Sequence, residues 1–371
     1  MSSQKLIYHC CSNSISQNGG GVKTYIKNLF SYKTADMSDN VINSLENIDQ
    51  SQFKLLHLHG GGRDFKLLEE VRRECPVVYT LHNHDPYCPS GTKYLSNNQV
   101  CCSRNMSYLP CIWGHLIDGC GSRRPGQMIT NIRHSYQQIR NLKLLKIPVL
   151  ATSNYMSQQI IKNGLSTEQI TVLPLGISVP RNAFKPLTWD VHQNQKILYV
   201  GRIVPYKGLD WLLKALAQTE FPIHLDIAGE GWARPQMEKL ANNLGIAKRI
   251  TWHGWCSTEK LDVLYQQCFA LIFPSVWSEP AGLVTLEAYA RHRPVIASAV
   301  GGIPEYVADR KTGILVPANN IKKLASAIIE LAQNYQKARR MSEEANIWFM
   351  KEFTIGIHIQ RLQKIYEQYI T

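Results

Sequence analysis

The sequence predicts an α/β protein built from two domains, each with a parallel sheet covered by helices. Three observations lead to this class. Short apolar runs alternate along the chain with segments of helical periodicity, a pattern typical of parallel sheets. A chain of 371 residues is too long for one ordinary hydrophobic core. A polar, proline-bearing run at residues 179–195 separates two such series and is the expected linker.

Composition and charge narrow the class of protein. Hydrophobic residues make up 44% and charged residues 19%, as in soluble globular proteins. No apolar run approaches the ~18 residues that span a bilayer, and residues 1–8 lack the pattern of a signal peptide, so we expect a cytoplasmic location. The net charge of +13 favours a phosphorylated ligand and an anionic membrane surface, or is a merely solvated basic surface. No nucleic-acid-binding module is present in the sequence, so nucleic acid is not an expected partner.

The first domain opens with a strand at residues 5–10, a run of glycines and a helix at 22–30. This order is typical of a phosphate cradle, and it makes Gly20 and Gly21 candidate phosphate contacts. The run is not GxGxxG and no acidic residue follows at the right distance, so a dinucleotide site is disfavoured. A plain flexible turn is the alternative.

Histidines mark the ends of the next strands. Residues 53–58 form a predicted strand, 64–73 a helix and 76–81 a third strand, which ends at His82. Because parallel strands place their carboxyl ends at one edge of the sheet, His82 and the following His84 and Asp85 are candidate site residues.

Residues 86–124 differ from the rest of the first domain: they are rich in cysteine, glycine and proline and show no clear periodicity. Zinc is one interpretation, but no spacing is CxxC; packing cysteines or a disulfide are the others, and the role stays open. The cysteines are Cys88, Cys101, Cys102, Cys111 and Cys120. From 86 to 140 one acidic residue, Asp118, stands against six basic ones: Lys93, Arg104, Arg123, Arg124, Arg133 and Arg140.

The second domain repeats the alternation. Predicted strands cover residues 196–200, 223–228, 269–273, 295–297 and 313–316, and another ends at 251–254; helices cover 209–217 and 321–334. The last helix, around 342–369, is interrupted near 353–356. The expected domains are therefore 1–178, a linker at 179–195, 196–350, and a final helical segment at 351–371.

One stretch, residues 275–287, carries the strongest chemical signal. Pro280 and Gly282 discourage a helix, so Glu279 is expected in a loop, whereas Glu287 falls about one turn inside the following helix. The first N–H groups of that helix are a natural anion cradle. Carboxylates on both sides accept hydrogen bonds from sugar hydroxyls. The stretch therefore predicts a site for a phosphorylated sugar.

Two basic residues stand just after the first strand of the second domain. Arg202 and Lys207 are suited to a diphosphate, the first as a hydrogen-bonding fork and the second as a point charge. The alternative is an exposed pair without function. Likewise, paired carboxylates such as Glu279 and Glu287 also occur in glycosidases.

These motifs together resemble the retaining GT-B glycosyltransferases of family GT4, also described as glycosyl transferases group 1. The resemblance rests on E-P-A-G-L-V-T-L-E at 279–287, with Gly201-Arg202, Lys207-Gly208, Gly229-Glu230-Gly231, residues 294–297 and residues 301–305. It covers the second domain almost continuously and the first in patches. Ala281 stands where many members carry phenylalanine, which changes the shape of the pocket.

The resemblance implies two Rossmann-like domains facing across a cleft, with the C-terminal helix crossing back to the first. It implies that His82 and Glu279 are catalytic and that His84 and Asp85 lie on the acceptor side. It assigns to the donor diphosphate Gly20, Gly21, Arg202, Lys207, Gly282, Leu283 and Val284. It assigns to the donor sugar Glu279, Pro280, Ala281 and Gly282, and to the nucleoside Glu287, Gly229, Trp255 and Cys256.

The function implied is retaining transfer of a hexose, glucose from UDP-glucose, to a saccharide or lipid-linked saccharide in polysaccharide or glycoconjugate synthesis. No D-x-D sequence is present, and GT-B enzymes need no metal for the diphosphate, so neither cofactor nor metal is expected. Two alternatives remain: a phosphorylase or hydrolase with the same fold, and a non-catalytic nucleotide-sugar binder. Reversible contact with an anionic membrane is expected for a lipid-linked acceptor.

Overall fold

The computed structural model describes residues 6–11, 21–31, 40–42, 53–60 and 64–370. It divides into two compact units, the first comprising residues 1–178 with 355–371 and the second residues 179–354. Residues 179–195, expected as a linker, group with the second unit and include a short helix, α7 (Trp189–Gln193). Leu187 N donates to Ser342 Oγ at 3.4 Å, which ties this segment to the rest of the second unit.

The first unit contains a six-stranded parallel sheet, in the order β2-β1-β3-β4-β7-β8. Its strands are β1 (Leu6–Cys11), β2 (Asn40–Ile42), β3 (Phe53–His59), β4 (Val77–Leu81), β7 (Val149–Ala151) and β8 (Ile170–Val172). β4 is buried along its whole length and β3 at every residue except Lys54, as expected for strands covered on both faces. The predicted α/β class is confirmed.

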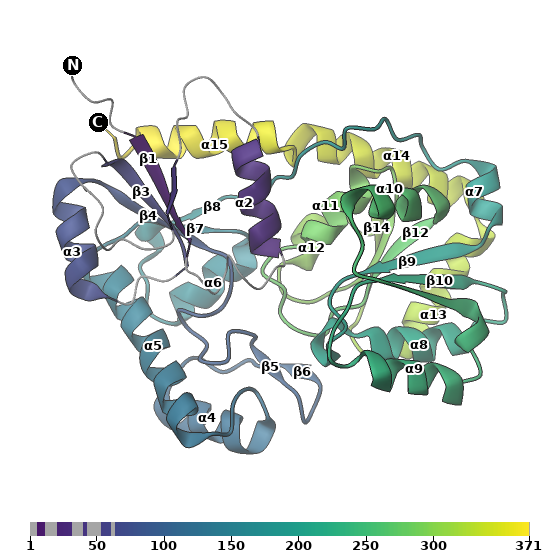
Figure 1. Cartoon of the computed structure of the whole chain (residues 1–371), viewed down its shortest axis with the longest axis horizontal. Coiled ribbons are helices and arrows are strands. Elements are labelled where there is room, and N and C mark those ends of the chain that lie inside the picture. The colour runs from purple at the N-terminus through teal and green to yellow at the C-terminus, as the bar shows by residue number, and fades with distance from the viewer. Residues whose placement is uncertain (1–5, 12–20, 32–39, 43–52, 61–63, 371) are drawn as a thin grey trace. The chain divides into compact units, whose positions relative to one another are not determined.

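Five helices of the first unit pack around this sheet or beside it (Figure 1). They are α2 (Gly21–Ser31), α3 (Phe65–Glu74), α5 (Pro125–Leu144), α6 (Asn154–Lys162) and α15 (Ile355–Glu367). Asp64 caps α3 by accepting from Leu67 N at 3.1 Å. α15 packs against α2, where Tyr25 Oη and His358 Nε2 lie 2.9 Å apart. The far end of the chain thus completes the core of the first unit.

The cysteine-rich segment lies between β4 and α5 and has little regular structure, as its sequence predicts. It contains the antiparallel pair β5 (Tyr94–Leu95) and β6 (Val100–Cys101), the helix α4 (Tyr108–Trp113) and a π-helical turn (Gly114–Asp118). No residue of α4 is buried.

The second unit contains another six-stranded parallel sheet, in the order β11-β10-β9-β12-β13-β14. Its strands are β9 (Lys196–Val200), β10 (His224–Ala228), β11 (Ile250–Gly254), β12 (Ala270–Phe273), β13 (Val295–Ser298) and β14 (Gly313–Val316). The helices are α8 (Leu209–Ala217), α9 (Arg234–Asn243), α10 (Thr258–Gln267), α11 (Leu283–Tyr289), α12 (Ile303–Tyr306), α13 (Ile321–Gln333) and α14 (Tyr335–Glu352). α8, α9 and α13 cover one face, and α10, α11 and α14 lie on the other (Figure 1).

The interrupted last helix is two helices, since α14 ends at Glu352 and α15 begins at Ile355. Ile355 N donates to Ile177 O at 2.8 Å, which fixes the start of α15 on the first unit. Among the helices that the structure describes, none combines the length and hydropathy required for a transmembrane segment.

Candidate functional site

The loop between β12 and α11 holds Glu279 in a buried position. Glu279 is only 5% exposed, and its neighbours from Leu271 to Gly282 are buried as well. Gly302 N donates to Glu279 O at 2.7 Å. A Cβ on Gly301, whose φ is 57°, would lie 2.4 Å from the same carbonyl oxygen, so only glycine permits this contact. The glycine pair thus fixes the backbone of Glu279.

The side chain of Glu279 forms an ion pair with Lys207. Lys207 Nζ lies 2.5 Å from Glu279 Oε1, and Ser275 Oγ donates to the same oxygen. The ammonium also lies 5.0 Å from the centre of the Trp277 ring, a cation–π contact. Within the described residues Glu279 Oε2 has no protein donor, so it is available to a ligand hydroxyl. The sequence did not predict this pair.

Glycine at position 208 brings Lys207 to Glu279. Gly208 has a φ of 74°, and a Cβ there would lie 1.9 Å from Pro274 O, so a larger residue would separate the two loops. Val276 N donates to Tyr206 O at 3.0 Å across the same contact. Arg202 remains exposed, with its guanidinium 5.7 Å from the centre of the Tyr206 ring.

The carboxyl ends of β9, β10 and β11 meet closely beside this loop. Gly229 N donates to Gly254 O at 2.7 Å, and a Cβ on Gly229 would lie 1.9 Å from Gly201 O. Trp255 and Cys256 follow directly. Trp255 is 73% exposed and presents its ring to solvent, whereas Cys256 Sγ donates to Gly254 O at 3.5 Å.

Glu287 lies in α11, one turn from its start, as predicted. Burial raises the pKa of its carboxyl group, and the nearby Arg291 partly offsets that shift. Arg291 donates to Glu287 O at 3.0 Å and forms a buried ion pair with Asp262 at 2.7 Å. Leu283 and Val284, at the start of the helix, are half-buried. These contacts hold α11 firmly against α10.

His82, at the end of β4, is the outer member of a chain of histidines. His82 Nε2 lies 2.9 Å from His59 Nδ1, and His59 Nε2 lies 2.9 Å from His9 Nδ1. The three rings come from adjacent strands, β4, β3 and β1. His82 is 9% exposed, and His9 and His59 are fully buried.

His82 and His59 are neutral, and their protons are coupled through the hydrogen bond between them. Burial lowers the pKa of His82 to about 3 and that of His59 well below its ordinary value. A neutral imidazole has one N–H, so His59 donates to one neighbour and accepts from the other. The proton on His82 therefore depends on the proton on His9. The sequence did not predict this chain of hydrogen bonds, although histidines at the ends of adjacent strands were its signal.

His57 joins the cluster and gives it the composition of a metal site. The ring nitrogens of His9, His57 and His59 lie within 4.8 Å of one another. Both nitrogens of His57 already have partners, however, since Tyr366 Oη lies at 2.5 Å and Thr80 Oγ1 at 2.6 Å. Both nitrogens of His59 also have partners, which are His82 and His9. The described contacts therefore favour a hydrogen-bonded network over a metal centre.

The two residues predicted on the acceptor side, His84 and Asp85, are buried and half-buried. His84 is fully buried, with Nδ1 2.7 Å from Tyr87 Oη. Asp85 is half-buried and accepts from Asn83 Nδ2 at 2.8 Å. Gly21 is the first residue of α2, and Gly20 lies outside the described residues.

Comparison with known proteins identifies the second unit. Residues 185–348 match the sequence profile of the family described as glycosyl transferases group 1. The alpha-D-kanosaminyltransferase of Streptomyces kanamyceticus is 31% identical over 175 residues, which cover 46% of this chain and 45% of that protein. The D-inositol 3-phosphate glycosyltransferase of Mycobacteroides abscessus is 40% identical over 141 residues, covering 37% and 32%. The match thus spans less than half of each relative.

Solved structures match the whole chain. Anabaena Alr3699/HepE in complex with UDP gives a TM-score of 0.72 at 17% identity, covering 98% of this chain and all of that one. Sucrose-phosphate synthase from Thermosynechococcus elongatus gives 0.72 at 19%, covering 98% of both. At these identities the likeness defines the fold. This chain therefore has the GT-B fold, and residues 185–348 within its second unit match the glycosyl transferases group 1 family.

Proposed function

We propose that the protein is a retaining glycosyltransferase that moves glucose from UDP-glucose to a saccharide or lipid-linked saccharide. One observation carries the proposal: Glu279 is held in a buried loop with one oxygen on Lys207 and the other available. The family of the second unit and the UDP complex of its Anabaena structural neighbour support a nucleotide-sugar donor.

The ion pair suggests how the donor would enter. A diphosphate offers Lys207 a stronger partner than one carboxylate oxygen, so donor binding would transfer the ammonium from Glu279 to phosphate. The carboxylate would then accept hydrogen bonds from the sugar hydroxyls, beside Pro280, Ala281 and Gly282. Arg202, exposed nearby, adds a second positive charge on the departing diphosphate.

The remaining donor contacts follow the resemblance. The N–H groups of Gly282, Leu283 and Val284 would face the diphosphate, and Glu287 would bind the ribose. The exposed ring of Trp255, with Cys256 and the backbone at Gly229, would face the base. These side chains would supply binding and charge neutralisation for the donor, and we expect no metal or cofactor at the donor site.

His82 would donate a hydrogen bond to the sugar near the anomeric carbon. Donation from His82 Nδ1 requires that His82 Nε2 accept from His59, which in turn must accept from His9. The chain of histidines would thus hold His82 in the donating tautomer. The acceptor is expected to attack the face from which the diphosphate leaves.

A lipid-linked acceptor is supported by an exposed apolar surface on the cysteine-rich segment. Leu109, Trp113, Leu116 and Ile117 are each 44% exposed or more. Six basic residues were expected to contact an anionic membrane. Two of them are not available for this contact, because Lys93 is buried and Arg104 is paired with Asp118 at 2.6 Å. The other four are exposed: Arg123, Arg124, Arg133 and Arg140.

A thermal-unfolding screen of nucleotide-sugars tests the donor assignment, because a ligand that binds only the native state raises the unfolding temperature. UDP and UDP-glucose should stabilise the protein, and UDP-glucose should be consumed when acceptor saccharides are added. Binding without turnover across many acceptors would indicate a non-catalytic binder. No stabilisation by any nucleotide-sugar would overturn the proposal, and visible absorbance from pyridoxal phosphate would favour a phosphorylase.

A further inference from the structure

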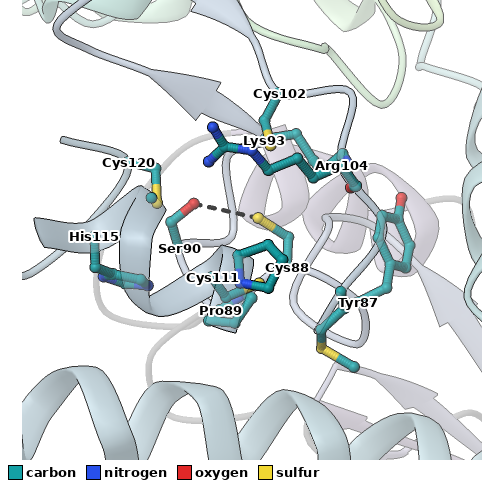
Figure 2. Close-up of a pocket in the computed structure, with 13 residues that line it drawn as sticks. Tyr87, Cys88, Pro89, Ser90, Lys93, Cys102, Arg104, Cys111, His115 and Cys120 are labelled. Carbon is teal, nitrogen blue, oxygen red and sulfur yellow. Dashed lines mark hydrogen bonds between the residues drawn. The ribbon is translucent and has the colours of Figure 1, made fainter. Parts of the chain in front are cut away.

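Four thiols surround one small cavity in the first unit (Figure 2). Cys88, Cys102, Cys111 and Cys120 line it, together with His115. The cavity has a volume of about 30 Å³, which suits a single ion or water and nothing larger. All four cysteines are free thiols. They come from separate parts of the cysteine-rich segment, so a shared ligand would tie that segment together.

A shared ligand would stabilise the cysteine-rich segment, because this segment has little hydrophobic core of its own. Its strands β5 and β6 have two residues each, and no residue of α4 is buried. Segments of this kind commonly depend on a metal or disulfides for their order. Yet the structure gives Gly114 and His115 fully buried positions at the cavity wall.

His115 leaves one ring nitrogen unpaired at the cavity wall. Its Nδ1 lies 3.0 Å from Ser122 O, which only accepts, so Nδ1 carries the proton. The ring is fully buried, and Nε2 has no partner among the described residues. A buried lone pair without a donor is costly, so this cavity is unfavourable as long as it is empty.

Lys93 places a buried positive charge at the wall of the same cavity. It is 2% exposed, lines the same cavity, and donates from Nζ to Arg104 O at 2.5 Å. No carboxylate of the described residues pairs with it. A buried ammonium without a counter-charge is strongly unfavourable. Its backbone φ of 51° adds strain, which persists only where the surroundings enforce it.

We propose that Cys88, Cys102, Cys111 and Cys120 bind a structural Zn²⁺ ion as thiolates. Four thiolates on one Zn²⁺ leave a net charge of −2, and Lys93 at the cavity wall offsets part of it, whereas Arg104 is already paired with Asp118. Each thiol loses its proton to solvent as its sulfur binds the metal. No three of these sulfur atoms lie within 4.8 Å of one another, so binding requires that the ion draw them inward.

The chain offers a matched control for this proposal. Cys101 is next to Cys102 in sequence and is equally half-buried, but it does not line the cavity. Cys102→Ser should therefore lose zinc, whereas Cys101→Ser should keep it. His115→Ala should also keep zinc, because His115 lies beside the four thiolates and is not one of the ligands.

The test is elemental analysis of the full-length protein, purified without a polyhistidine tag and without added chelator. We expect one zinc per chain, and a cobalt-substituted protein with the visible bands of tetrahedral thiolate coordination. These two measurements need no variant, so misfolding of Cys102→Ser does not affect them. Absence of zinc, with the four thiols titrating freely in the native protein or joined in disulfides by mass, would overturn the site. Loss of zinc in His115→Ala or in Cys101→Ser would overturn this ligand set.

Discussion

The pairing of Glu279 with Lys207 leads to different expectations for the two carboxylates of the donor site. Glu279→Ala should abolish most transfer but leave affinity for free UDP unchanged or higher, because Lys207 is released for the diphosphate. Glu287→Ala should weaken UDP itself by about ten- to a hundredfold, the usual range for a lost charged hydrogen bond. Titration calorimetry measures the affinity of both variants for UDP. Glu343→Gln, an exposed glutamate of α14, is the control. Equal losses of UDP affinity would show that the two roles are wrongly assigned.

His82 should matter for turnover and not for nucleotide binding. His82→Ala should lower the rate by ~10²–10⁴, as for other positioned polar catalytic groups, with UDP affinity near that of the wild type. His59→Phe should give a smaller loss, because it removes only the partner that orients His82. Rates under saturating donor distinguish the two. Full activity in His82→Ala would move the catalytic role elsewhere.

The positions of single residues could be predicted where neighbouring residues in the sequence determine them, and not where contacts between distant residues do. The loop position of Glu279 and the helix position of Glu287 follow from Pro280 and Gly282, all within nine residues. The contact between Lys207 and Glu279 joins residues 72 apart, and it depends on β9 and β12 being neighbours in the sheet. Burial of His84 likewise depends on Tyr87 and Met156, which no local pattern places beside it.

At the scale of elements, the buried histidines of β3, of the end of β4 and of α15 make the first unit sensitive to acid. Burial lowers the pKa of His82 to about 3 and of His358 to about 4, and lowers those of His57 and His59 well below 6.5. Above pH ~6.5 these rings are neutral in both the folded and the unfolded state. As the pH falls below that value, only the unfolded chain takes up protons, so folding weakens until the folded rings protonate.

Each such histidine should cost up to about 1.4 kcal/mol of stability per pH unit. The free energy of unfolding, measured with urea at several values from about pH 8 to about pH 5, should stay level at first and then fall steeply. A curve that is flat across this range would contradict the neutral network.

The exposed apolar residues of α4 and the π-helical turn should bind lipid. Sedimentation with anionic liposomes should recover the protein at low salt and release it at high salt, because each exposed arginine near the surface contributes ~1 kcal/mol. Trp113→Ser should weaken this binding. Trp232→Ser is the matched control, since Trp232 is also exposed but belongs to the second unit. Equal recovery with neutral and anionic liposomes would point to a soluble acceptor.

Regular elements were predictable and irregular ones were not. β9, β10, β12, β13 and β14 could be expected from their apolar runs, because a strand buried on both faces needs little else, whereas the edge strand β11 is mostly half-buried. The pair β5–β6 and the π-helical turn have no such signal. Their shape depends on side chains that meet around a cavity, such as Lys93 and His115, which lie far apart in sequence.

At the scale of the whole molecule, the sequence predicted two sheets of parallel strands and a break before the last helix. It did not predict that residues 179–195 group with the second unit, because their polar, proline-bearing composition is that of a linker. Contacts such as Leu187 with Ser342, and Tyr335 Oη with Leu187 O at 3.3 Å, join them to α14.

The first unit is discontinuous in the chain, and this has a consequence for synthesis on the ribosome. Tyr366 and His358, which contact His57 and Tyr25, are translated only after the whole of the second unit. Domains usually fold in the order in which they emerge, but here that order should be reversed. Nascent chains stalled at a length at which the second unit has left the ribosome but α15 is still in the exit tunnel should protect the second unit from protease while the first stays cleavable. Protection of the first unit at that length would show that it does not wait for its last helix.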